Sequence, residues 1–221
     1  MAAEPLGTAD SYGGYRQQLV ETLQIKGIRD LAVLRAISVT PRHRFVPDSV
    51  RHRAYEDSAL PIAAGQTISQ PWVQARSIEE LRLTGREKVL EVGAGSGYQT
   101  ALLSQMAGNV IAIERIAVLA DGARRVIAEL GIRNVTVMVG DGTLGWRSLS
   151  PFDAIVVAAA SPSVPAPLVD QLAEGGRMIV PLGTKEEQTL TLVEKSGGEV
   201  LVRPLSDVRF VPLLGQFGFR G

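Results

Sequence analysis

The 221-residue chain is long enough for one medium α/β domain with an added region, and 45% of its residues are hydrophobic. Because 23 basic residues balance 23 acidic ones, we expect neither nucleic acid nor an anionic membrane as a partner. The absence of cysteine excludes a disulfide and a catalytic thiol, and with two histidines we expect no metal site. No apolar stretch reaches the roughly 18 residues of a membrane span, and the start lacks a secretory pattern, so we expect a cytoplasmic protein.

The first 80 or so residues predict a helical region that packs on the main domain. We expect a loose tail over residues 1–14, and apolar residues spaced four apart predict a helix over 15–23. Asp30 is expected to cap a second helix, and the proline-punctuated stretch 42–65 is expected to be an irregular connection. The residues of the second helix that should face inward are Leu31, Leu34 and Ile37.

From residue 88 onward, predicted strands and helices alternate, which is typical of a parallel sheet with helices on both faces. The end of the chain differs, because Ser196-Gly197-Gly198 separates two strand-like runs and predicts an antiparallel hairpin over 189–205. The predicted parallel strands are 88–92, 110–114, 135–139, 153–158 and 177–181, and the predicted helices are 98–106, 117–130 and 165–173.

The first predicted strand runs into a glycine-rich loop, Leu90-Glu91-Val92-Gly93-Ala94-Gly95-Ser96-Gly97. Glycine permits a positive φ and lets a backbone approach a ligand closely. A loop between a strand and a helix is expected to offer free N–H groups to a polar ligand. The spacing is G-x-G-x-G rather than the G-x-G-x-x-G of dinucleotide-binding folds, so it predicts a nucleotide-type cofactor other than NAD.

Two acidic residues follow the next two predicted strands. Glu114 can accept hydrogen bonds from the hydroxyls of a ribose, and Asp141 is well placed for an adenine amino group. Each feature alone has a plainer interpretation, as a tight turn or a solvated carboxylate. Their placement at three successive strand ends favours a cofactor site, because ligands of open α/β sheets bind at the carboxyl ends of strands.

This combination resembles the S-adenosylmethionine-dependent class I methyltransferases. The resemblance implies an α/β fold with a doubly wound, mostly parallel seven-stranded sheet, in the Rossmann-like methyltransferase arrangement. Its strand order would be 3-2-1-4-5 followed by an antiparallel pair. We expect two parts, namely an N-terminal helical region over 1–80, which includes a substrate-side loop, and the cofactor-binding domain over 81–221.

The stretch Gly65-Gln66-Thr67-Ile68-Ser69-Gln70-Pro71-Trp72 resembles the signature of bacterial protein-L-isoaspartate O-methyltransferases. Further matches, such as those at 42–47, 92–100 and 140–146, extend the resemblance over about residues 15–214. The resemblance implies methyl transfer from S-adenosyl-L-methionine to the α-carboxyl of L-isoaspartyl residues in aged proteins and peptides, with S-adenosyl-L-homocysteine as product. The methyl ester then forms a succinimide, which can open to aspartate.

The family pattern implies that Ser69 is the active-site serine, whose hydroxyl orients the substrate carboxylate. From the residues alone, Ser69 is also expected to be a helix N-cap, because Pro71 suits the first turn that follows. Substrate contacts are implied for Thr67, Ile68, Pro212 and Leu213, and cofactor contacts for Gly93, Gly95, Ser96, Gly97, Glu114, Arg115, Gly140, Asp141 and Gly142.

The segments Ala63-Ala64-Gly65 and Gln74-Ala75-Arg76-Ser77 depart from the family pattern, which leaves the substrate range open. Three alternatives remain: a relative that methylates a small molecule or another carboxylate, a non-catalytic binding module, and an NAD-dependent dehydrogenase, which the glycine spacing disfavours. We expect a monomer, because a protein substrate needs an accessible cleft.

Overall fold

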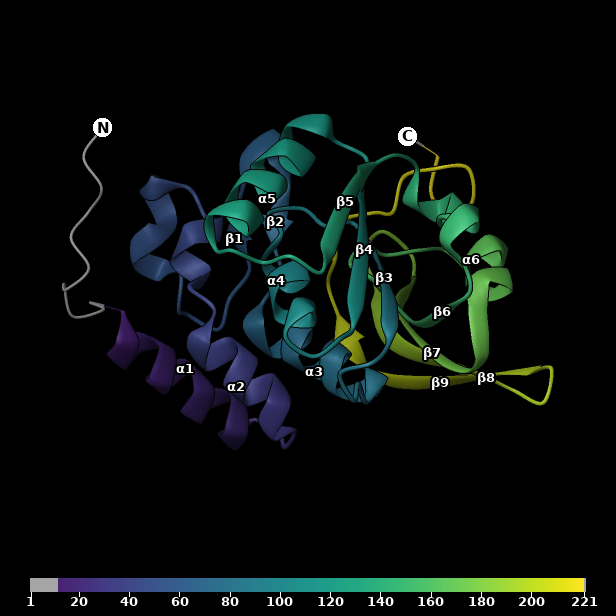
Figure 1. The fold of residues 1–221 in the computed structure, drawn as a ribbon, viewed down its shortest axis with the longest axis horizontal. Helices are drawn as coiled ribbons and strands as arrows, with labels where there is room; N and C mark the ends of the chain where they lie inside the picture. Colours follow the sequence, from purple (N-terminus) through teal and green to yellow (C-terminus); the bar gives the residue numbers. More distant parts are fainter. Residues whose placement is uncertain (1–11, 221) are drawn as a thin grey trace.

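The computed structural model describes residues 12–220, which build a seven-stranded sheet with the order β5-β4-β3-β6-β7-β8-β9 (Figure 1). A separate two-stranded sheet pairs β1 with β2. The strands are β1 (Leu60–Pro61), β2 (Thr67–Ile68), β3 (Lys88–Val92), β4 (Asn109–Glu114), β5 (Val135–Val139), β6 (Phe152–Val157), β7 (Leu172–Gly183), β8 (Gln188–Ser196) and β9 (Glu199–Val208).

The sheet confirms the expected fold class. Strands β5, β4, β3, β6 and β7 pair in parallel, whereas β8 pairs antiparallel with both β7 and β9. Numbered from β3, the order is 3-2-1-4-5 followed by two antiparallel strands. The carboxyl ends of β3, β4 and β6 therefore meet at one edge, which is where ligands bind in such sheets.

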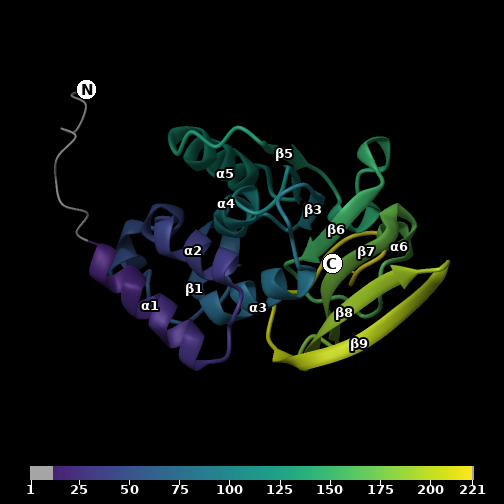
Figure 2. The same cartoon turned by 60° about the horizontal axis from the view of Figure 1, so that its bottom comes forward.

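Helices cover both faces of this sheet. Alternate residues of β3 point to opposite faces: Val89 joins the core beneath the N-terminal helices, and Leu90 joins the core that contains Leu168 of α6. Figure 2 shows α1 and α2 beyond one face, with α6 on the other side. The helices are α1 (Gly13–Ile25), α2 (Leu31–Val39), α3 (Pro71–Leu81), α4 (Tyr98–Ser104), α5 (Ala117–Glu129) and α6 (Ala166–Gln171).

The N-terminal helices differ from expectation in two details. Gly13 and Gly14 lie in α1 rather than in a tail, and residues 1–11 lie outside the described part of the chain. The Asp30 carboxylate caps α2 by accepting hydrogen bonds from two backbone N–H groups, as expected. The inward orientation expected for Leu31 is wrong, because this residue begins the helix on its outer side and is 76% exposed.

The N-terminal region and the sheet share one hydrophobic core, which extends from Leu19 in α1 to Leu192 in β8. The division at residue 80 stays a prediction, as does the cytoplasmic location. No helix within residues 12–220 is long and apolar enough to cross a membrane.

Candidate active site

The glycine-rich loop joins β3 to α4 at the expected edge of the sheet. Gly93, Gly95 and Gly97 have φ angles of +87°, +54° and +86°, which favour glycine. At Gly97, a Cβ atom would lie only 2.9 Å from the Cβ of Ala123, so α5 packs directly against the loop. Gly97 therefore serves both the turn and the approach of the neighbouring helix, whereas Gly93 and Gly95 serve the turn.

The expectation that this loop offers free N–H groups is wrong for Gly93, Ala94, Gly95 and Gly97, the last of which donates to the Ala94 carbonyl oxygen at 2.8 Å. The N–H groups of Gly93 and Ala94 donate to the carbonyl oxygen of Ile113 at 2.8 and 3.1 Å, and that of Gly95 donates to Glu114 Oε2 at 2.8 Å. The end of β4 uses these donors because it lies beside the loop. The loop backbone is consequently held against the end of β4 by three hydrogen bonds.

Glu114 links the glycine-rich loop to the start of α5. Its second carboxylate oxygen accepts a hydrogen bond from the Ile116 N–H at 2.8 Å, and the residue is 7% exposed. Each carboxylate oxygen has a second lone pair. Glu114 can thus still accept a hydrogen bond from a ligand hydroxyl.

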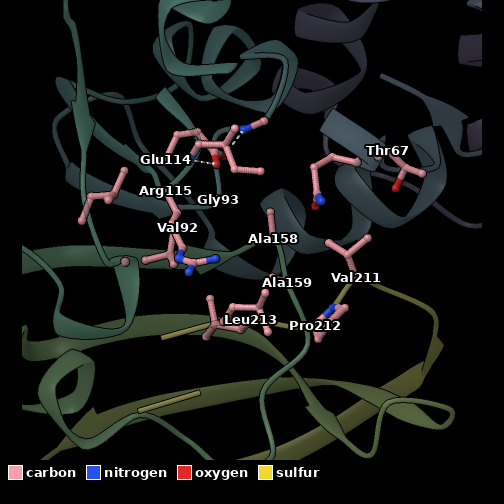
Figure 3. Close-up of a pocket in the computed structure, with 17 residues that line it drawn as sticks. Thr67, Val92, Gly93, Glu114, Arg115, Ala158, Ala159, Val211, Pro212 and Leu213 are labelled. Carbon is pink, nitrogen blue, oxygen red and sulfur yellow. Dashed lines mark hydrogen bonds between the residues drawn. The ribbon is translucent and has the colours of Figure 1, made fainter. Parts of the chain in front are cut away.

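A cavity of about 250 Å³ extends from the stretch 65–72, here called the signature loop, to the end of β4. In Figure 3, Thr67 lies on one side, Glu114 and Arg115 lie on the other, and Ala158 lies between them. The cavity brings together these residues implied by the sequence: Thr67, Gly93, Gly95, Glu114, Arg115, Gly142, Pro212 and Leu213. Its further walls are Gly65, Gln66, Val92, Ile113, Ile116, Ala158, Ala159, Val211 and Leu214.

Ala158 and Ala159 are wall residues that the sequence analysis did not name. They follow β6 directly, so they lie at the carboxyl end of a parallel strand. The rule that placed Glu114 and Asp141 at strand ends applies equally to them. They were missed because alanine carries no polar group that would mark a site.

A second, smaller cavity of about 30 Å³ adjoins the main one and contains Ser69 in its wall. The two cavities share the wall residues Thr67, Gly93, Gly95 and Ala158. The walls that belong to the small cavity alone are Ile68, Ser69, Gln74, Glu91, Ala94, Ser96 and Gln99.

Glu91 is a fully buried carboxyl group in the wall of the small cavity. Burial raises its pKa to about 8, although hydrogen bonds from Thr100 and Gln99 act in the opposite direction. The nearby Glu114 raises it further. Glu91 is therefore mostly protonated at neutral pH and adds little charge to the cavity.

The signature loop is held in place by Asp57 rather than by a serine cap. Gln70 is the N-cap residue of α3, and Asp57 Oδ1 accepts a hydrogen bond from the Trp72 N–H at 2.8 Å. The expectation that Ser69 caps this helix is thus wrong. Within residues 12–220, no hydrogen bond of the Ser69 hydroxyl is found, which leaves this group available to a ligand.

The segment after β9 closes the main cavity from the other side. The Leu213 N–H donates to the Ala160 carbonyl oxygen at 2.7 Å, and the Ala160 N–H donates to the Val211 carbonyl oxygen at 2.8 Å. Pro212 pairs with Ala160 between these two bonds. Pro212 and Leu213 are therefore fixed beside the end of β6, where they form part of the wall.

Three residues with implied cofactor contacts lie outside both cavities: Gly97, Gly140 and Asp141. The Asp141 carboxylate accepts hydrogen bonds from the Thr143 N–H and hydroxyl and from the Gln216 N–H. Partial burial raises the pKa of Asp141, but these hydrogen bonds lower it more, so it lies below its ordinary value. Asp141 thus joins the end of β5 to the C-terminal segment, next to the cavity residue Gly142.

The main cavity fits an adenosine-containing cofactor. The apolar side chains of Val92, Ile113 and Ile116 offer apolar contact for a base, and Glu114 offers an acceptor for ribose hydroxyls. A Cβ at Gly142 would lie 2.5 Å from a Val92 side-chain atom, so only a glycine lets the backbone at residue 142 approach Val92 in the cavity wall this closely.

Comparisons with known proteins agree with this geometry. The sequence profile described as protein-L-isoaspartate(D-aspartate) O-methyltransferase (PCMT) matches residues 15–218. The protein-L-isoaspartate O-methyltransferase of Methanoculleus marisnigri is 48% identical over 214 residues, which cover 96% of this chain and 97% of the relative. That of Dictyoglomus turgidum is 49% identical over 212 residues, with 96% of each chain covered.

Solved structures of the same name share the fold. One superposes with a TM-score of 0.84 at 31% identity and covers 92% of this chain and 67% of its own. Another, from Plasmodium falciparum and in complex with S-adenosyl-L-homocysteine, has a TM-score of 0.80 at 29% identity, with 90% and 98% covered. The chain therefore belongs to the protein-L-isoaspartate(D-aspartate) O-methyltransferase family.

Proposed function

We propose that this chain transfers a methyl group from S-adenosyl-L-methionine to the α-carboxyl of L-isoaspartyl residues in damaged proteins and peptides. The observation that carries the proposal is the shared wall between the two cavities, one lined by Ser69 and the other by Glu114. Because the cavities adjoin, a methyl donor in the main cavity would lie next to an acceptor carboxylate in the small cavity. The family membership and the likeness to a structure that holds S-adenosyl-L-homocysteine support it.

The chemistry needs alignment more than proton transfer. When bound, the cofactor supplies a methyl group on a positively charged sulfur. The substrate carboxylate is already ionised at neutral pH, so no general base has to create the nucleophile. The protein has to hold the carboxylate oxygen in line with the methyl carbon, and such orientation is worth effective molarities of about 10⁵ M or more.

In this proposal the Ser69 hydroxyl orients the substrate carboxylate. Its freedom from helix capping supports the role, because a hydroxyl that already serves as a cap would be less available. Thr67 and Ile68 border the transfer site, where β2 pairs with β1 to fix their backbone. Pro212 and Leu213 cover the substrate from the segment that is tied to Ala160.

The cofactor residues divide along the main cavity. The glycine-rich loop, with Gly93, Gly95, Ser96 and Gly97, would face the amino-acid end, and Glu114 would bind the ribose hydroxyls. Asp141 and Gly142 would face the adenine, with Arg115 and Gly140 beside them. Asp141 accepts three hydrogen bonds, two on Oδ1 from Thr143 and one on Oδ2 from Gln216, which leaves one lone pair on Oδ2 for an adenine amino group.

We further propose that the enzyme acts as a monomer on protein chains and not on nucleic acid. In a monomer, no second copy covers the cavity that the signature loop and residues 211–214 line. The balanced charge of the chain gives no overall attraction for phosphate backbones.

Locating the ester tests the proposed reaction. An isoaspartyl peptide is incubated with the enzyme and S-adenosyl-L-methionine, and tandem mass spectrometry finds which carboxyl carries the methyl group. We expect the ester on the α-carboxyl of the isoaspartyl residue alone. An ester on another carboxyl would favour a different acceptor, and binding of S-adenosyl-L-homocysteine without any ester would favour a non-catalytic module.

A further inference from the structure

Arg42 is a buried cation that lies directly behind the Ser69 loop. Its side chain is 0% exposed, and its Nη2 donates a hydrogen bond to the Ser69 carbonyl oxygen at 2.9 Å. Its Nη1 donates to Gln74 Oε1 at 3.0 Å. Burial lowers the pKa of Arg42 to about 10, so the guanidinium stays charged at neutral pH.

No carboxylate within residues 12–220 forms an ion pair with Arg42. Asp57 acts on it only at longer range, because Asp57 pairs with Lys26 at 2.6 Å and caps α3. The face of the Tyr98 ring, whose centroid is 4.8 Å from Arg42 Cζ, gives partial compensation. A buried cation without a contacting anion lowers the free energy of unfolding, so we look for a functional reason for its presence.

Two of the three hydrogen-bond acceptors of Arg42 belong to the wall of the small cavity, and the third is the Ser58 carbonyl oxygen at 3.5 Å. Ser69 and Gln74 line this cavity, and so does Glu91, which is mostly protonated at neutral pH. The guanidinium behind the wall is therefore not cancelled by the buried carboxyl in the wall. Arg42 thus places a positive charge without an ion-pair partner directly behind the wall of the small cavity, and such a charge attracts an anion.

We propose that Arg42 is a positioning residue for the methyl transfer, which holds the Ser69 loop and makes the small cavity select a carboxylate over a neutral group. The hydrogen bonds fix the Ser69 backbone and the Gln74 amide, and the charge attracts the ionised substrate group. This inference rests on the proposed function. It identifies Arg42 as the residue that makes the enzyme prefer an ionised acceptor group.

A pair of peptides separates the charge effect from a general loss of structure. One peptide carries the isoaspartyl α-carboxylate, and the other carries a neutral α-carboxamide at the same place. Their dissociation constants are measured with enzyme saturated by S-adenosyl-L-homocysteine, so that no turnover occurs. We expect the wild type to prefer the carboxylate by about tenfold or more, which corresponds to about 1.4 kcal/mol. In Arg42→Met we expect this ratio to fall to about 1–3.

Two further variants allow the proposal to be tested even if Arg42→Met folds poorly. Arg42→Lys retains the charge but loses the two-pronged hydrogen bonding, so it should keep most of the preference and lose kcat. Arg44→Met is the matched control, because Arg44 lies two residues away and pairs with Glu129 on α5 at 2.6 Å. It should leave the ratio unchanged.

A merely structural role would lower the melting temperature or the fraction of enzyme that binds S-adenosyl-L-homocysteine, without changing the ratio. An unchanged ratio in Arg42→Met, or a ratio lost in Arg42→Lys, would overturn the inference. Failure of the proposed function looks different, because the wild type would then methylate neither an isoaspartyl peptide nor its aspartyl counterpart, or would methylate both equally.

Discussion

Asp57 accepts a hydrogen bond from the backbone N–H of Trp72 at 2.8 Å, and through this contact it caps α3 from outside the helix. The same carboxylate pairs with Lys26 at 2.6 Å and accepts a bond from the Gln70 side-chain amide at 3.1 Å. One buried carboxylate thus anchors α1, the signature loop and α3 to one another. The loop that presents Ser69 depends on it.

Replacing Asp57 by alanine should therefore destabilise the fold around the signature loop. Loss of a helix cap typically costs about 0.5–2 kcal/mol, and we expect a value near the upper end because the site is buried. Urea unfolding measures the change. Asp48→Ala is the control, because its side chain is 86% exposed and, among the described residues, forms an ion pair with Arg51 alone, so it should cost less than about 0.5 kcal/mol. Equal effects of the two variants would refute the capping role.

Ser69→Ala should impair methyl transfer without affecting stability, because Asp57 and not Ser69 caps α3. A lost hydrogen bond to a charged group is worth about 1.5–3 kcal/mol, so we expect kcat/KM for an isoaspartyl peptide to fall by about 10- to 100-fold. The dissociation constant of S-adenosyl-L-homocysteine and the melting temperature should stay constant. Ser38→Ala, which removes a hydroxyl bonded to Arg35, is the control. A drop in melting temperature with normal activity would contradict the proposed role.

Ala64 lies in the left-handed region with a φ of +56°, next to the signature loop. A non-glycine residue pays about 1–2 kcal/mol there, which exceeds the entropy cost of about 0.5–1 kcal/mol for glycine. Ala64→Gly should thus raise the free energy of unfolding slightly. Its neighbour Ala63 has no positive φ, so Ala63→Gly should lower it by about 0.4–1 kcal/mol. Thermal unfolding of both variants checks this. A lower free energy of unfolding in both variants would show that the backbone of Ala64 is unstrained.

Glu91 predicts a dependence of stability on pH. Burial raises its pKa from 4.5 to about 8 in the folded chain. Between these values the folded chain binds more protons than the unfolded chain, so this group makes stability fall as the pH rises from about 5 to 8. Glu91→Gln mimics the protonated form and should remove this part of the slope. Urea unfolding of the wild type and Glu91→Gln at about pH 5 and pH 8 measures this slope. An equal change of stability with pH in the two proteins would contradict the raised pKa of Glu91.

Most strands and helices after residue 88 could be predicted because their apolar periodicity is local, but the helix expected over 165–173 ends at Gln171 and the strand expected over 177–181 spans Leu172–Gly183. The contacts that hold the signature loop could not, since Asp57 reaches Trp72 across 15 residues and Arg42 reaches Ser69 across 27. Both partnerships exist only after the chain has folded. Local reasoning therefore favoured Ser69 as the cap, because a serine before Gln70-Pro71 suits a helix start.

The glycine-rich loop shows a second limit of the sequence. Its spacing correctly predicted a strand, a turn with positive φ and a following helix. It could not show that the end of β4 occupies the N–H groups of Gly93, Ala94 and Gly95. That use depends on the parallel pairing of β3 with β4, which the glycine pattern does not encode.

Initial rates of methyl transfer to two peptides that differ only at one residue test the proposed reaction most directly. One peptide contains L-isoaspartate and the other contains L-aspartate at the same position, and both are assayed with labelled S-adenosyl-L-methionine. We predict transfer to the isoaspartyl peptide and none above background to its aspartyl twin. Equal labelling of the two peptides would contradict isoaspartyl recognition.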